Sequence, residues 1–253
     1  MSDSPSPVRG ARTKALSAML RLLARTTPWV ESEVLGLRRV VRPGMVCVDA
    51  GAALGLYTAV LSDLAGPRGT VHSVEPLLFA HPAMSALLRP RSGANVRRHA
   101  LALGAASDET VIRVPVRNGG LVTGRSFIER DALGVGPNDE FEAHIDVRVR
   151  VESLDGLCAS AGIERVDFIK GDVEGAELAL LHGAEQTIES HRPALLLEIE
   201  ARHTRRYGHE PEDVTAWLSA RGYRMYALRG TGWHPVTRVV PGIRNYLFRH
   251  SGD

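Results

Sequence analysis

Residues 46–58 read VCVDAGAALGLYT, and this stretch decides the class of fold. A short apolar run ends at Asp49, a turn of small residues follows, and a helical pattern begins at Gly55. A strand that passes into a helix through a tight turn is the first part of a β-α-β unit. Ligands of open α/β sheets bind at the carboxyl ends of such strands, where small residues let the backbone come close to them. The turn is therefore a candidate cofactor site.

The same alternation of short apolar runs and helical stretches continues along the chain. We expect strands over 45–48, 70–74, 96–101, 166–169, 194–199 and 224–228, and helices over 55–64, 82–88, 174–183 and 211–220. Continuous short apolar runs are typical of parallel strands that are buried on both faces. The sequence predicts an α/β fold, with a mostly parallel sheet and helices on both faces.

Three segments stand outside this alternation. Residues 1–10 show no periodicity and are expected to form a disordered tail, and residues 11–44 are expected to carry helices over 11–25 and 31–41. The helix over 11–25 mixes apolar residues with arginines, so we expect it to pack on the domain, with binding to a membrane surface as the alternative. Within the main domain, 45–253, residues 110–151 predict a β-rich insertion with a turn at Asn118-Gly119-Gly120.

Composition excludes several classes of protein. The 253 residues are 44% hydrophobic and 24% charged, as in an ordinary globular domain, and the net charge of +2 gives little support to nucleic-acid binding. We expect no membrane span, since no apolar run is long enough, and a cytoplasmic location, since no signal peptide is visible. The two cysteines, Cys47 and Cys158, are too few for a disulfide framework and are expected to be buried and reduced.

A carboxylate follows the strand over 70–74, at Glu75-Pro76. Nucleotide-binding α/β folds place an acid at this position, where it accepts hydrogen bonds from the ribose hydroxyls. NAD and S-adenosylmethionine both contain this ribose, so Glu75 alone does not choose between them. Gly51 and Gly55 are four residues apart with Ala53 between them, which departs from the G-x-G-x-x-G pattern of dinucleotide binding.

Charged residues also follow the strands over 166–169 and 194–199. Lys170, Asp172 and Glu174 come after the first of these strands, and Glu198 and His203 after the second. Such charges are costly at a strand end unless they are paired or exposed, so the group predicts a shaped site. His203 beside a carboxylate is suited to act as a base near neutral pH. Magnesium held by Asp172, Glu198 and His203 is a further possibility in chemical terms, but no spacing signature supports it.

These motifs together resemble the FkbM family of S-adenosylmethionine-dependent methyltransferases. The resemblance spans about 31–248 and rests on D-x-G-A-x-x-G-x-Y-T at 49–58, V-E-P at 74–76, S-L-D at 153–155, D-F-I-K-x-D-V-E-G-x-E at 167–177, and R-P at 192–193 running into Glu198-Ile199. The 167–177 block is its most specific part. Two positions depart from the usual family pattern: Ala53 replaces an asparagine, and Gly171 replaces a branched apolar residue.

The resemblance implies a Rossmann-like class I methyltransferase fold whose sheet is completed by an antiparallel pair over 224–228 and 245–248. It implies S-adenosylmethionine as cofactor and an O-methyltransferase that acts on a hydroxyl of a small-molecule acceptor, a natural product or a sugar. The residues then expected to bind the cofactor are Asp49, Gly51, Ala52, Ala53, Gly55, Tyr57, Thr58, Glu75, Pro76, Ala102, Asp172 and Glu174. The rivals are a nicotinamide-dependent oxidoreductase and a non-catalytic cofactor-binding or RNA-binding module, and homo-oligomerisation is left open.

For the chemistry, we expect Asp172 near the methyl donor and His203 as the preferred base, with Glu198 as the alternative. Lys170 is expected to orient Asp172. The insertion over 110–151 is expected to bind the acceptor through Arg125, Phe127 and His144, with glycines such as Gly124 allowing it to move. The cofactor site is expected to be built on the central strands, without a contribution from the insertion.

Overall fold

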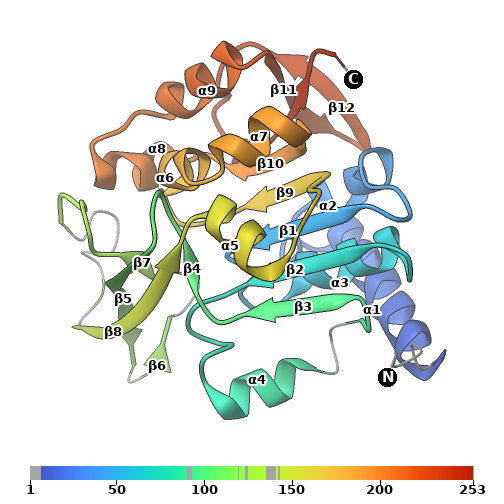
Figure 1. Cartoon of the computed structure of the whole chain (residues 1–253), viewed down its shortest axis with the longest axis horizontal. Coiled ribbons are helices and arrows are strands. Elements are labelled where there is room, and N and C mark those ends of the chain that lie inside the picture. Colours follow the sequence, from blue (N-terminus) through green and yellow to red (C-terminus); the bar gives the residue numbers. More distant parts are fainter. Residues whose placement is uncertain are drawn as a thin grey trace.

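The computed structural model describes residues 7–89, 93–118, 120–122, 125–134, 141 and 143–252. In this part of the chain an eight-stranded sheet has the order β12-β11-β13-β10-β9-β1-β2-β3 (Figure 1). Its parallel strands are β1 Val46–Ala50, β2 Thr70–Val74, β3 Val96–His99, β9 Phe168–Gly171 and β10 Ala194–Glu198. Its antiparallel strands are β11 Tyr223–Arg229, β12 Gly232–Val236 and β13 Asn245–His250. The predicted α/β class, the Rossmann-like sheet and its antiparallel C-terminal strands are confirmed.

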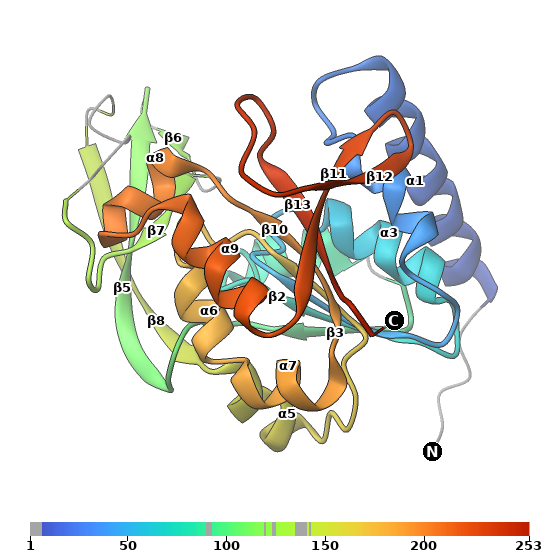
Figure 2. The same ribbon diagram turned by 90° about the horizontal axis from the view of Figure 1, so that it is seen from above.

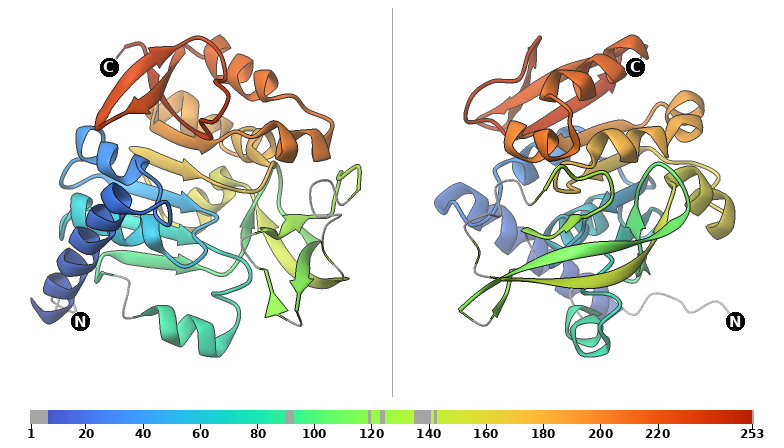
Figure 3. Two further views of the ribbon diagram at one scale, coloured as in Figure 1. Left: turned by 180° about the vertical axis from the view of Figure 1, so that it is seen from behind. Right: turned by 90° about the vertical axis from the view of Figure 1, so that its left-hand side faces the viewer.

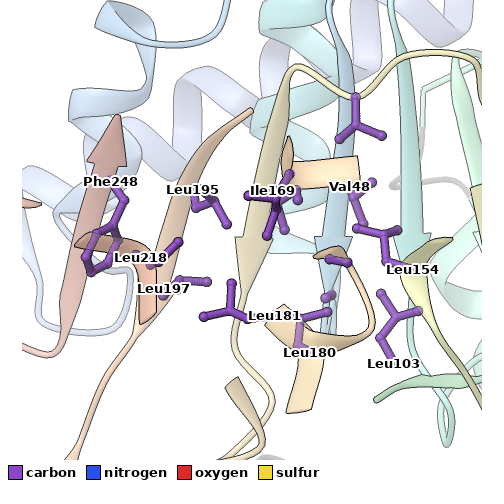
Figure 4. Close-up of a cluster of buried hydrophobic side chains, with 14 of the residues drawn as sticks. Val48, Leu103, Leu154, Ile169, Leu180, Leu181, Leu195, Leu197, Leu218 and Phe248 are labelled. Carbon is purple, nitrogen blue, oxygen red and sulfur yellow. The ribbon is translucent and has the colours of Figure 1, made fainter. Parts of the chain in front are cut away.

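Helices cover both faces because successive strand residues point to opposite sides. On one face Val48, Ile169 and Leu195 pack with residues of α5 Leu154–Ala161, α6 Glu177–His182, α7 Glu185–His191 and α9 Pro211–Ala220 (Figure 4). On the other face Cys47 and Phe168 pack with residues of α1 Pro7–Thr26, α2 Glu33–Gly36 and α3 Leu56–Ala65. Two further helices, α4 Pro82–Leu88 and α8 Ala201–Thr204, complete the set of α-helices in the described residues.

The insertion forms a second sheet at the end of the molecule opposite α1 (Figures 2 and 3). Its path is β4-β8-β5-β6, with β7 paired to β5. The bounds are β4 Ala102–Leu103, β5 Asp108–Arg117, β6 Gly120–Leu121, β7 Phe127–Ile128 and β8 Ala143–Glu152. The long antiparallel ladder between β5 and β8 confirms the predicted β-rich insertion. Gly119 of the predicted turn and Gly124 lie outside the described residues.

Several element boundaries differ from those expected. Of the predicted tail 1–10, residues 1–6 lie outside the described residues, but α1 already begins at Pro7, since proline is tolerated at the first helical position. The helix expected over 31–41 is only α2 followed by a 3-10 helix Leu37–Arg39. The strand expected over 96–101 ends at His99, and the chain then enters the second sheet as β4.

The structure also shows the state of the two cysteines and the length and apolar character of the described helices. Cys47 and Cys158 are free and buried, as expected. None of the described helices combines the length and the apolar character that a membrane span requires.

Candidate active site

The turn after β1 packs directly on the backbone of the segment after β9. Gly51 has a φ of +76°, and a Cβ atom at this position would lie 1.8 Å from the carbonyl oxygen of Asp172. The N–H groups of Gly51 and Ala52 donate to the carbonyl of Val74, at 3.1 and 3.0 Å. Only glycine combines this conformation with so close an approach, and the turn thereby joins the carboxyl ends of three neighbouring strands.

Ala53 sits in the same turn with a φ of +44°, in the left-handed region that an alanine rarely adopts. Replacing Ala53 with glycine should therefore stabilise the fold by about 1 kcal/mol, measured as the free energy of unfolding in urea. Ala106→Gly is the matched control, because Ala106 is exposed and has no positive φ. An equal change in both variants would contradict strain at Ala53.

Glu75 holds the turn to the end of β2. Its Oε1 accepts the N–H groups of Leu77 and Leu78, at 2.8 and 3.3 Å, and its Oε2 accepts the N–H of Ala53, at 3.1 Å. The side chain is 8% exposed, and burial raises the pKa of its carboxyl. Two carboxylate oxygens offer about four acceptor positions, so three backbone bonds leave room for a ligand hydroxyl.

The main pocket lies between this turn and the insertion. Its lining includes seven residues expected at the cofactor site: Gly51, Ala53, Glu75, Pro76, Ala102, Asp172 and Glu174. The insertion supplies another wall, made by Ile112, Ser126, Phe127 and Ile128. The pocket that gathers these residues is thus not built on the central strands alone, because the insertion lines it as well. The physical reason is that β4, which carries Ala102, is itself a strand of the second sheet.

A second pocket lies on the other side of the turn. It shares Gly51, Ala53 and Asp172 with the main pocket, and it is lined further by Asp49, Ala52, Tyr57 and Lys170. The segment between α1 and α2 closes it with Trp29, Val30 and Glu31. This segment was not predicted as part of the site, although Trp29 followed two residues later by Glu31 was a usable signal in the sequence. Because they share part of their lining, the two pockets are adjacent.

Asp49 and Thr58 form a buried pair beneath the turn. The Thr58 hydroxyl donates to the Asp49 carboxyl and lies 2.8 Å from the Ser73 hydroxyl. Burial raises the pKa of Asp49 to about 6. Asp49 lines the second pocket, whereas Thr58 lines neither pocket and positions Asp49 instead. Gly55, which also lines neither pocket, has a φ of +76° and caps the start of α3.

Lys170 is buried among acids and an aromatic ring. Its Nζ lies 3.3 Å from Asp172 Oδ2 and 5.0 Å from the centre of the Tyr57 ring. Tyr57 in turn donates its hydroxyl to Glu31, at 2.6 Å. Burial lowers the pKa of Lys170, but the surrounding carboxylates, Asp172 and Glu31 foremost, outweigh burial and raise it overall. The ammonium group therefore stays charged and pairs with Asp172.

Glu198 lies behind Asp172 rather than in either pocket. Burial, together with the charge of Asp172 and a hydrogen bond to it, raises the pKa of Glu198 to about 10. The pKa of Asp172 moves the other way: burial raises it, but the charge of Lys170 and the hydrogen bonds from Glu198 and Lys170 together outweigh burial and lower it overall. Near neutral pH Glu198 thus carries a proton and donates it in a hydrogen bond to the Asp172 carboxylate.

His203 is also behind the pocket wall. It is 3% exposed, and its Nδ1 lies 2.6 Å from Oε2 of Glu174, which does line the main pocket. Glu174 has a φ of +55°, and the next residue, Gly175, packs so closely that a Cβ there would lie 2.4 Å from the His203 carbonyl oxygen. This backbone contact holds α8, and with it His203, against the segment after β9.

Glu177 is buried beneath the main pocket, with 1% of its surface exposed. It was not among the residues predicted for the site. Its Oε1 accepts the N–H groups of Val173 and Gly175, both at 3.2 Å, and so shapes the pocket segment from beneath. Burial raises its pKa from 4.5 to about 7. Spacing within the 167–177 block pointed to Glu177, but its inward direction depends on where α6 begins.

Glu177 should make stability depend on pH. Between its unfolded pKa near 4.5 and its folded pKa near 7, the folded state keeps a proton that the unfolded state has released, so stability falls as pH rises. Relative to Glu177→Gln, wild-type protein should lose roughly 2–3 kcal/mol across this window and nothing further above it. Urea unfolding at several pH values measures this difference, and parallel curves for the two proteins would refute it.

The residues expected to bind the acceptor are not gathered in one place. Phe127 lines the main pocket, with the Arg206 guanidinium 3.9 Å from its ring centre. Arg125 and His144 are absent from the lining of both pockets; Arg125 packs instead against the Phe141 ring. Among the described residues no group of three or more histidine, cysteine, aspartate or glutamate side chains is arranged to hold a metal ion.

The chain is similar to one curated relative and to several solved structures. One curated relative, the AMB antimetabolite synthetase AmbE of Pseudomonas aeruginosa, is 27% identical over 243 residues, which cover 82% of this chain and 11% of AmbE. The chain thus spans about a tenth of the length of that relative. Among solved structures, a methyltransferase FkbM from Methylobacillus flagellatus KT matches with a TM-score of 0.49 and 18% identity, covering 95% of this chain and 58% of that one. A putative O-methyltransferase from Klebsiella pneumoniae matches with a TM-score of 0.46 and 10% identity, covering 98% and 91%.

The family of the chain is shown by a family model and not by these individual matches. The model of the methyltransferase FkbM domain matches residues 49–225, which include the turn after β1, Glu75, and the segments after β9 and β10. The chain therefore belongs to the FkbM methyltransferase family.

Proposed function

We propose that the protein transfers a methyl group from S-adenosylmethionine to a hydroxyl group of a small molecule, a natural product or a sugar. The observation that carries this proposal is the position of Asp172, whose side chain borders both pockets and is fixed by Lys170 and Glu198. A cofactor in one pocket and an acceptor beside it would then meet at a fixed carboxylate. Membership of the FkbM methyltransferase family supports the reaction class.

The residues present fit S-adenosylmethionine. Glu75 offers a buried carboxylate to the ribose hydroxyls, and it shares the lining of the main pocket with Gly51, Ala53 and Asp172. The carboxylate of Asp172 suits the positive charges of the methionyl part. When bound, the cofactor supplies an activated methyl group, so the protein mainly has to orient the acceptor oxygen and accept its proton.

Glu174 and His203 are suited to take that proton. Glu174 faces the main pocket, and His203 contacts it from behind. His203 would then act through Glu174 as a positioning residue, since it does not line the pocket. Glu198 is a poor base near neutral pH, because its raised pKa keeps it protonated.

The acceptor is assigned to a small molecule for two reasons. The pocket walls from the insertion are mainly apolar, with Ile112, Phe127 and Ile128 beside Ser126, as is common for small-molecule sites. The name of the relative AmbE, an antimetabolite synthetase, also fits natural-product chemistry. A cytoplasmic location, the absence of a nucleic-acid partner and independence from magnesium stay predictions.

Calorimetry with S-adenosylhomocysteine and with NAD tests the cofactor, and transfer of labelled methyl to a library of hydroxylated acceptors, followed by mass spectrometry, tests the reaction. We expect binding of S-adenosylhomocysteine alone and labelled methyl ethers. Binding of NAD instead would favour the oxidoreductase, and cofactor binding without transfer to any acceptor would favour a non-catalytic binder.

The proton acceptor is tested by Glu174→Gln and His203→Gln. Both should lower kcat by about 100-fold with little change in KM for the acceptor, because general-base catalysis contributes about that factor. For His203→Gln the loss should shrink at high pH, where hydroxide replaces the base. Wild-type kcat in both variants would assign proton removal elsewhere.

A further inference from the structure

The outer face of α1 exposes large apolar side chains, which is unusual for a helix that faces only water. Met19 and Leu22 are 51% and 59% exposed, whereas Thr13 and Ser17 are 5% and 0% exposed on the side that packs against the domain. A helix with only water outside normally places its apolar residues inward and its polar ones outward. Here the inner side holds hydroxyl groups as well as leucines, and large apolar side chains point outward.

This apolar character continues past the end of the helix. Trp29, three residues after α1, is 86% exposed, and Leu54, which lines the second pocket together with Trp29, is 45% exposed. Tryptophan combines a large apolar surface with one polar N–H group and is enriched where membranes meet water. We call Met19, Leu22, Trp29 and Leu54 the α1 face. Its helix lies on the outside of the molecule, away from the insertion (Figures 2 and 3).

The same segment is strongly basic. Residues 7–30 contain five of the chain's 31 basic residues and none of its 29 acidic ones. Arg12, Lys14 and Arg25 are exposed, whereas Arg21 is paired with Asp63 of α3 at 3.1 Å. In a chain whose net charge is only +2, this concentrates positive charge where the apolar side chains are exposed.

We propose that the α1 face docks the protein on an anionic membrane surface. Positive charge combined with outward leucine, methionine and tryptophan matches anionic headgroups above an apolar layer. A docked protein would hold the second pocket at the membrane, because Trp29 and Leu54 belong both to the α1 face and to the pocket lining. The docking needs no methyl transfer, so its test is independent of the proposed function.

Flotation of the full chain with vesicles tests the proposal, using phosphatidylcholine alone and phosphatidylcholine mixed with phosphatidylglycerol. We expect binding to the anionic vesicles only, and release at high salt. The double variant Arg12→Gln/Arg25→Gln should bind about 30-fold more weakly, since each basic residue contributes about fivefold. Trp29→Ala should bind roughly tenfold more weakly. Methyl transfer to a soluble acceptor should stay at the wild-type level in the double variant.

Arg148→Gln/Arg150→Gln is the matched control, because it removes the same charge from exposed positions on β8 of the insertion, far from α1. It should bind the anionic vesicles like wild type. The proposal is overturned if wild type does not bind them, if the control loses as much affinity as the α1 variant, or if Leu22→Gln dissolves a dimer in solution. The last outcome would make a second copy of the chain the occupant of the α1 face.

Discussion

Replacing Gly51 with alanine should abolish cofactor binding and remove most of the stability of the fold. The new Cβ would lie 1.8 Å from the Asp172 carbonyl oxygen, and that oxygen is backbone, which cannot rotate away. The turn and the segment after β9 must separate, and with them the two borders of both pockets. We expect a loss of at least about 4 kcal/mol in the free energy of unfolding, as for the most disruptive single substitutions.

Gly44→Ala separates this steric effect from backbone strain. Gly44 also has a positive φ, +87°, but a Cβ at this position would meet no atom within 4 Å. Its loss should therefore be only about 1–2 kcal/mol, with binding of S-adenosylhomocysteine preserved. Urea unfolding and calorimetry on both variants measure the difference. Similar losses in the two variants would show that the approach of Gly51 to Asp172 is not what holds the site together.

Glu75→Ala should weaken binding of S-adenosylhomocysteine by about 100-fold, since it removes a charged acceptor and leaves three backbone N–H groups without their partner. Stability should fall as well, because Ala53 and Leu77 then lose their common anchor. Calorimetry measures the first effect and urea unfolding the second.

Glu75→Gln separates the role of Glu75 in cofactor binding from its role in the stability of the fold. An amide has one acceptor oxygen, which suffices for the N–H groups of Leu77 and Leu78, so the fold should lose less stability than in Glu75→Ala. The oxygen that accepts from Ala53 becomes a donor, so cofactor affinity should still fall by roughly tenfold. A glutamine variant with wild-type affinity would remove Glu75 from the cofactor site.

Local sequence predicted the elements whose signals are local. The strand over 70–74 and the helices over 82–88 and 211–220 have the expected bounds, because Pro82 and Pro211 mark helix starts and a buried strand needs an unbroken apolar run. The helix expected from residue 174 starts only at Glu177. Positive φ angles at Glu174 and Gly175 delay it, and they depend on the contact with His203.

The site residues that directly follow neighbouring parallel strands could be predicted from the sequence. Strand order brings Gly51, Glu75 and Asp172 together, since neighbouring parallel strands end side by side. Whether a side chain lines a pocket or lies behind its wall depends on packing, which the spacing of residues in the sequence does not reveal. His203 and Glu198 were expected in the site and line neither pocket, whereas Trp29 was not expected and lines the second pocket.

The strand β4 places two requirements on the same few residues. It belongs to the sheet of the insertion, yet Ala102 and Leu103 border the main pocket beside Glu75. Under the proposed function, selection or engineering for a new acceptor would act on the insertion, and each change there would also shift a wall of the main pocket. Variants with a broader acceptor range should therefore bind the cofactor more weakly. Second substitutions that restore cofactor affinity should accumulate on β4 and β8.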